Sequence, residues 1–126
     1  MRDLYTGYFA QAKKYLDRDL VCVSIAGKAP FYYKGLEYKT LAPKYSFFIQ
    51  YKNGEIDEEG YVSEYYRLVL NNLDSQKVLE DIDRLTHCAD SVVLLCYEKP
   101  GDFCHRHLVG KWITDNTELK VEEFKL

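Results

Sequence analysis

Two nearly continuous apolar runs mark the interior of this chain, at residues 20–25 and 91–97. Runs of this length that are rich in β-branched residues are typical of strands buried on both faces of a parallel sheet. An earlier strand is predicted over 4–9 by its aromatic and β-branched content. Alternating apolar and charged residues predict a short edge strand over 119–124, whereas 31–43 reads as irregular.

Apolar positions at helical spacing fill most of the remaining chain. Helices are expected over 11–16 and 45–52, and two more should begin at Asp57 and Asp74, whose side chains can cap them. The first of these two helices should bury one stripe of side chains: Val62, Tyr65, Tyr66, Val69 and Leu73. The last helix should begin at Cys104 and bury another: Leu108, Val109, Trp112 and Ile113.

This alternation of strands and helices predicts an α/β fold. We expect a single three-layer domain over residues 1–126, with a small, mainly parallel sheet of Rossmann-like character flanked by helices. With 47% apolar and 29% charged residues, the composition is that of an ordinary globular protein. No apolar run is long enough for a membrane span, and no signal-like segment opens the chain, so we expect a cytoplasmic protein with reduced cysteines and no membrane partner.

Charge is distributed unevenly along the chain. The net charge of −3 argues against a generally cationic DNA-coating protein, yet residues 28–52 hold five lysines against Glu37 alone. Aromatic residues are interleaved with these lysines, as in surfaces that contact phosphates and bases, so a nucleotide or nucleic acid is a candidate partner. The Tyr-rich segment 31–51 would also suit a protein partner, because Tyr offers a large area with a polar tip.

The segment 92–106 carries the most chemistry. A predicted strand ends at Cys96, a polar loop follows, and Cys104, His105 and Arg106 open a helix. Unpaired backbone N–H groups and the helix dipole favour an anion at such a helix start. Helical spacing turns Cys104 and His105 toward the sheet and His107 toward solvent.

Three chemistries fit these residues. The helix start and its cationic neighbours can make Cys104 a thiolate; Arg106, the loop N–H groups and Lys28 can hold a phosphate; and Cys96, Cys104 and His105 can ligate zinc. Structural zinc sites usually show two close ligand pairs and only one is present, so we expect no metal and no cofactor. The cysteine-to-arginine spacings also differ from those of a phosphatase loop, and no Gly-rich nucleotide fingerprint occurs.

The carboxyl ends of parallel strands share one edge, where ligands bind in α/β folds. There, Glu98 is a candidate general acid or base, so that the candidate catalytic residues are Glu98, Cys104 and His105. A small residue among bulky ones at Gly7 allows a ligand or another chain segment to approach closely. The candidate ligand-binding residues are Arg106, Lys28, Ser24, Cys96, Tyr5 and Gly7.

These motifs resemble the DUF488 family of small uncharacterised proteins. The resemblance rests on 4–8, on 23–26 with Lys28 and Pro30, and above all on Cys96-Tyr97-Glu98 running into Cys104-His105-Arg106. It implies an α/β fold and no established reaction. Many members carry an Asp-Val-Arg type motif where this chain has Ser24-Ile25-Ala26, so an acidic residue and an arginine are missing here. If those two groups do chemistry in the family, this chain either binds without catalysing or uses Lys28 instead.

The sequence thus favours a protein that binds a phosphate-bearing ligand, a nucleotide or a nucleic-acid end, in the crevice at the strand carboxyl ends. Hydrolysis or transfer at the nucleotide, with Glu98 as acid or base, is the first candidate reaction. The alternatives are a non-catalytic interaction module, such as an inhibitor or adaptor, and a thiol redox sensor. Salt dependence of binding separates the first two, because capture through Lys and Arg weakens with added salt.

Overall fold

Five parallel strands form the centre of the protein. The computed structural model describes residues 1–99 and 101–126, and within them the strand order is β3-β2-β4-β1-β5. The strands are β1 (Asp3–Tyr8), β2 (Val21–Ser24), β3 (Leu36–Glu37), β4 (Ser91–Cys96) and β5 (Glu122–Glu123). β4 lies between β1 and β2, with Cys96 opposite Tyr8 and Leu95 opposite Ser24. The predicted α/β fold is confirmed.

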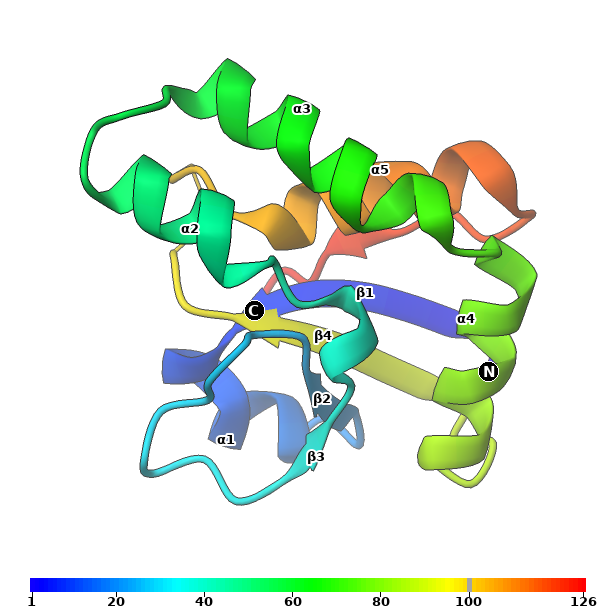
Figure 1. The fold of residues 1–126 in the computed structure, drawn as a ribbon. Coiled ribbons are helices and arrows are strands. Elements are labelled where there is room, and N and C mark those ends of the chain that lie inside the picture. Colours follow the sequence, from blue (N-terminus) through cyan, green and yellow to red (C-terminus); the bar gives the residue numbers. More distant parts are fainter. Residues whose placement is uncertain (100) are drawn as a thin grey trace.

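Helices cover both faces of this sheet (Figure 1). α1 packs on one face, and α2 to α5 lie on the other, with α3 above α5 in the view of Figure 1. The helices are α1 (Ala12–Leu16), α2 (Tyr45–Lys52), α3 (Glu58–Leu68), α4 (Ser75–Leu85) and α5 (His105–Asn116). As predicted, Asp57 and Asp74 cap α3 and α4 by accepting hydrogen bonds from backbone N–H groups of the first turn.

The alternation of β4 side chains divides the core into two clusters. Val92 and Leu94 pack toward α2 to α5, while Val93 and Leu95 pack toward α1. All four are fully buried, which explains why this strand reads as a continuous apolar run. By the same alternation, Cys96 faces the side of α5.

Two sequence predictions need correction. Segment 31–43 is not wholly irregular, because Leu36–Glu37 pairs with β2 as an edge strand. The predicted buried stripe of α3 is correct at Tyr65 and Val69, but Tyr61 is buried in place of Val62 and Tyr66, which are only half-buried. The aromatic ring of Phe47, on α2, packs against Tyr61 and Tyr65 and selects that face.

The connections diverge where β1 and β4 end. The chain leaves β1 toward α1 on one face, and it leaves β4 toward α5 on the other (Figure 1). Such a switch point, outside the carboxyl ends of the strands, is where ligands bind in open α/β sheets. Of the helices in residues 1–99 and 101–126, none has the length and hydrophobicity needed to cross a membrane.

Candidate functional site

A buried cluster of two thiols and an imidazole lies at the carboxyl end of β4. Cys96 is the last residue of β4, Cys104 occupies the N-cap position of α5, and His105 is its first residue. The two sulfur atoms and a ring nitrogen of His105 all lie within 4.8 Å of one another. Cys104 and His105 face inward and His107 is exposed, as predicted.

His105 is held by hydrogen bonds at both ring nitrogens. Nε2 lies 2.9 Å from the backbone carbonyl oxygen of Ile25, and Nδ1 lies 3.3 Å from Sγ of Cys96. Since a carbonyl oxygen only accepts, Nε2 carries the hydrogen and donates it. In the neutral ring, Nδ1 therefore turns its lone pair toward Cys96.

The two thiols differ in acidity. Hydrogen bonding from Cys96 is the main cause that lowers the pKa of Cys104; burial opposes it, and the Arg106 backbone N–H reinforces it. The pKa of Cys96 is raised, first because it donates to Cys104 and then by burial. Of the two thiols, Cys104 is therefore the one that loses its proton more readily, and its anion would be stabilised by an N–H of the helix start.

Arg106 is fully buried and paired within the chain. Its Nε lies 3.0 Å from Oε1 of Glu123, and its Nη2 lies 2.9 Å from Oε2. Nη1 donates to the backbone carbonyl of Glu98, and Thr6 Oγ1 donates to Glu123 over 2.6 Å. Arg106 therefore ties α5 to β5 and to the loop after β4, and a phosphate contact through it stays a prediction that requires one of these pairs to open.

Two other predicted ligand-binding residues lie on the α1 face, away from the thiols. Tyr5 packs edge-on against Phe124, with ring centroids 4.9 Å apart. A side chain at Gly7 would place its Cβ only 2.6 Å from the hydroxyl oxygen of Tyr15 and 2.8 Å from a methyl group of Val93. The close approach predicted at Gly7 is thus made by Tyr15 from the protein's own core.

The remaining predicted residues lie along the edge itself. Ser24 is fully buried, and its hydroxyl accepts from the backbone N–H of Ala26 over 3.3 Å. Lys28 is exposed, and its carbonyl accepts from the Tyr97 hydroxyl, which links the loop after β2 to the loop after β4. Glu98 is half-buried in that second loop.

The sequence analysis missed three residues around the cluster. Glu123 forms the ion pair with Arg106. The ring centroid of Tyr65 lies 5.6 Å from that of His105, and the ring centroid of Tyr61 lies 5.1 Å from that of Phe103. Burial, followed by the neighbouring thiols, raises the pKa of Tyr61, so its hydroxyl stays protonated beside the cluster. Tyr61 and Tyr65 are spaced i, i+4, a signal that could have identified them as one face of α3.

Comparison with known families places the chain in one of them. A sequence model of the active DUF488-N3 subclade matches residues 30–117. The chain belongs to the DUF488 family. The part that matches this family includes Cys96, Cys104, His105 and Arg106, whereas Glu123 lies beyond it. Neither the curated proteins nor the solved structures gave a match.

Proposed function

We propose that this protein binds a phosphate-bearing ligand, a nucleotide or a nucleic-acid end, at the carboxyl edge of its sheet and catalyses hydrolysis or transfer on it. The observation that carries the proposal is the buried cluster of Cys96, Cys104 and His105 at the switch point of the sheet, in which the pKa of Cys104 is lowered by its neighbours. Buried groups with displaced pKa values gather at functional sites, because catalytic acids, bases and nucleophiles need pKa values that suit their reaction. The description of the matching subclade as active agrees with an enzyme.

Features beside the cluster support a nucleotide rather than a simple anion. Phe31, Tyr32 and Tyr97 expose 88%, 54% and 49% of their surfaces, which is unusual for large aromatic side chains. Lys28 lies in the loop that leads to the first two and is joined to Tyr97 through its carbonyl. Aromatic faces that stack on bases next to a lysine that contacts phosphate are typical of surfaces for single nucleotides and unpaired strands.

Each residue of the edge has a role in this proposal. Lys28 and the loop N–H groups contact the phosphate, and Glu98 transfers the proton, since it is half-buried yet reaches solvent. Arg106 acts as a positioning residue that fixes the Glu98 loop by its hydrogen bond to the Glu98 carbonyl. The four cysteines are free, and the reducing cytoplasm, where we expect the protein to act, would keep them so.

The test is a backbone-amide NMR titration with inorganic phosphate, a panel of nucleotides and short single-stranded oligonucleotides. We expect shifts at 24–28, 96–98 and 103–106, weaker binding in Lys28→Ala, and weaker binding with added salt. Lys77→Ala is the matched control, because Lys77 is an exposed lysine on α4. Well-dispersed spectra that no nucleotide or oligonucleotide perturbs at this edge would overturn the proposal.

One observation favours a second candidate, a non-catalytic interaction module. Tyr45, at the start of α2, is 74% exposed, so the exposed aromatics of segment 31–51 extend beyond the loop near Lys28. A protein partner on this surface would bind with little salt dependence. Tyr45→Ala would weaken that binding and leave a nucleotide titration unchanged.

A further inference from the structure

We propose that Cys96, Cys104 and His105 bind a zinc ion and leave its fourth coordination position open. This proposal deepens the proposed function, because it names the reactive group at the same edge of the sheet. It rests on the geometry of the three side chains, which can be tested without knowledge of the substrate.

The separations fit one zinc ion. Zinc bonds of about 2.3 Å to sulfur and about 2.0–2.1 Å to nitrogen require ligand atoms roughly 3.5–3.8 Å apart in a tetrahedral site. Cys96 Sγ and His105 Nδ1 are 3.3 Å apart, and the three ligand atoms lie within 4.8 Å of one another. The three ligand atoms thus already lie close to the separations that a tetrahedral zinc site requires.

His105 is already oriented as a metal ligand. Its Nε2 donates to the Ile25 carbonyl, which leaves the Nδ1 lone pair directed at the thiols. Metal-binding histidines almost always donate their second ring N–H to a carboxylate, carbonyl or water, since this bond fixes the ring and its tautomer. Ile25 belongs to another element, so the orientation is imposed by the fold.

The three potential ligand atoms also crowd together around few hydrogens. The Cys96 sulfur lies 3.3 Å from Nδ1 of His105, whose lone pair faces it, and within 4.8 Å of the Cys104 sulfur. Zinc would satisfy all three atoms at once: the thiol protons leave to solvent on binding, and two thiolates with a neutral imidazole balance the two positive charges of the ion. The positive charge of the nearby Arg106 guanidinium should repel the zinc ion only weakly, because Glu123 pairs with it.

The ligand set indicates which metal and which kind of site. Two thiolates and an imidazole suit zinc, whereas magnesium and calcium prefer oxygen ligands. Among the residues that the structure describes, only these three Cys, His, Asp or Glu side chains form such a group. Structural zinc sites have four protein ligands, while catalytic sites have three and a water whose pKa is lowered to about 7. That water would supply the hydroxide for the hydrolysis proposed above.

The experiment measures metal binding directly. Protein purified without chelator is expected to contain one zinc per chain, and cobalt(II) added to stripped protein should give thiolate-to-cobalt charge-transfer bands and the visible bands of a tetrahedral site. Cys96→Ser, Cys104→Ser and His105→Gln should each weaken metal affinity at least tenfold. Cys88→Ser is the matched control, because Cys88 is an exposed cysteine outside the cluster.

Zinc should also protect Cys96 and Cys104 of the wild-type protein from alkylation, as read by mass spectrometry, which keeps the test decisive if a variant fails to fold. Folded, reduced protein that binds neither zinc nor cobalt, or that keeps the cobalt spectrum without Cys96, would overturn the proposal. Nucleotide titrations of zinc-loaded and stripped protein separate the two proposals. If the protein binds metal but no nucleotide, the zinc site stands and the proposed function falls. If it binds nucleotide but no metal, the proposed function stands and the zinc site falls.

Discussion

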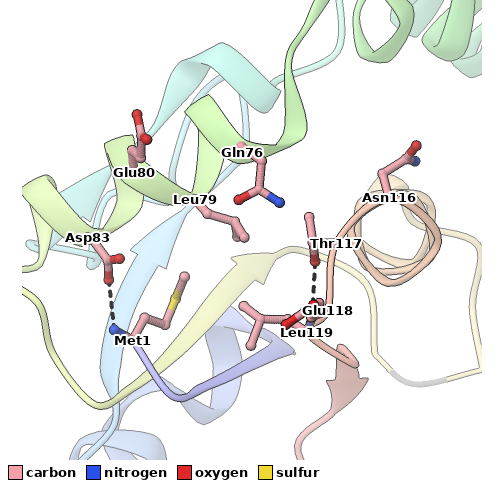
Figure 2. A pocket seen from close by; sticks show the side chains of 9 residues that line it. All are labelled: Met1, Gln76, Leu79, Glu80, Asp83, Asn116, Thr117, Glu118 and Leu119. Carbon is pink, nitrogen blue, oxygen red and sulfur yellow. Dashed lines mark hydrogen bonds and ion pairs between the residues drawn. The ribbon is translucent and has the colours of Figure 1, made fainter.

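The two ends of the parallel sheet differ in both shape and chemistry. At the amino end, an open pocket lies between α4, the end of α5 and the first residue of the chain (Figure 2). Its lining is polar and acidic: Met1, Gln76, Leu79, Glu80, Asp83, Asn116, Thr117, Glu118 and Leu119. At the carboxyl end, the two thiols and His105 form a buried cluster, and Arg106, the next residue of the chain, is buried as well.

This difference shows that an open pocket and the most reactive side chains can lie at opposite ends of the same sheet. The lining of the pocket in Figure 2 contains no cysteine or histidine, and the amino group of Met1 pairs there with the partly exposed carboxylate of Asp83. The carboxyl end is where loops from two central strands diverge, so side chains from separate elements converge there by topology. In the proposed function, a ligand at that end approaches along the loops after β2 and β4.

The largest loss of stability at the carboxyl end is expected when one charge of the Arg106–Glu123 pair is removed. Glu123→Gln leaves Arg106 buried without a counter-charge, and we expect a loss of about 3 kcal/mol in the free energy of unfolding, at the lower end for buried pairs because Glu123 is partly exposed. Urea unfolding measures it. Glu122→Gln is the matched control, since its partner Lys120 is exposed, and it should cost under about 1 kcal/mol. Equal costs for the two variants would contradict the role given to Arg106.

The thiolate of Cys104 should make the stability of metal-free protein depend on pH. Because its pKa is lowered in the folded state, the unfolded chain binds more protons between that pKa and the ordinary thiol value near 9. The free energy of unfolding should therefore rise with pH across this window and fall toward acid, by at most about 1.4 kcal/mol per pH unit. The measurement is the difference between wild type and Cys104→Ser from about pH 5 to pH 8.

Cys88→Ser is the control for this pH series, because an exposed cysteine should leave the curve parallel to wild type. A difference between wild type and Cys104→Ser that stays constant with pH would show that Cys104 remains a thiol. The pKa of Cys96 is raised in the folded state, so this thiol lowers the free energy of unfolding with rising pH only above the ordinary thiol pKa near 9. It therefore does not affect the measurement between about pH 5 and pH 8.

The sequence predicted those parts of the molecule that local signals determine. The run over 91–97 became β4, and the caps Asp57 and Asp74 set the start of α3 and α4. Each signal lies within a few residues of its consequence, so no knowledge of the tertiary structure is needed to read it.

The interactions at the carboxyl end needed tertiary structure. Arg106 read as a phosphate ligand because its partner Glu123 lies on an edge strand, which pairs with the first strand of the chain. The presence of only one close ligand pair argued against zinc, yet the end of β4 and the start of α5 bring the Cys96 and Cys104 sulfur atoms together. Ile25, which orients His105, acts through its backbone carbonyl and so leaves no signal in the sequence.

A smaller effect is expected where the carboxyl half of β1 packs against α1. Gly7→Ala would force a Cβ against Tyr15 and Val93, and such overpacking should cost about 1–3 kcal/mol. Gly27→Ala is the matched control, since a Cβ there meets nothing within 4 Å and should change stability little. Urea unfolding of both variants measures the difference. If Gly7→Ala kept wild-type stability, Tyr15 would not occupy the space beside β1, and a ligand could enter it.

The smallest effect is expected at the amino end. Asp83→Asn removes the charge that pairs with the Met1 amino group, over 3.0 Å in the structure. Since the carboxylate is 35% exposed and screened by water, the loss should stay below about 1 kcal/mol, and metal content and nucleotide titrations should match wild type. A change in nucleotide binding in Asp83→Asn would assign function to the open pocket instead of the buried cluster. Unchanged nucleotide binding would indicate that the pocket at the amino end of the sheet takes no part in it.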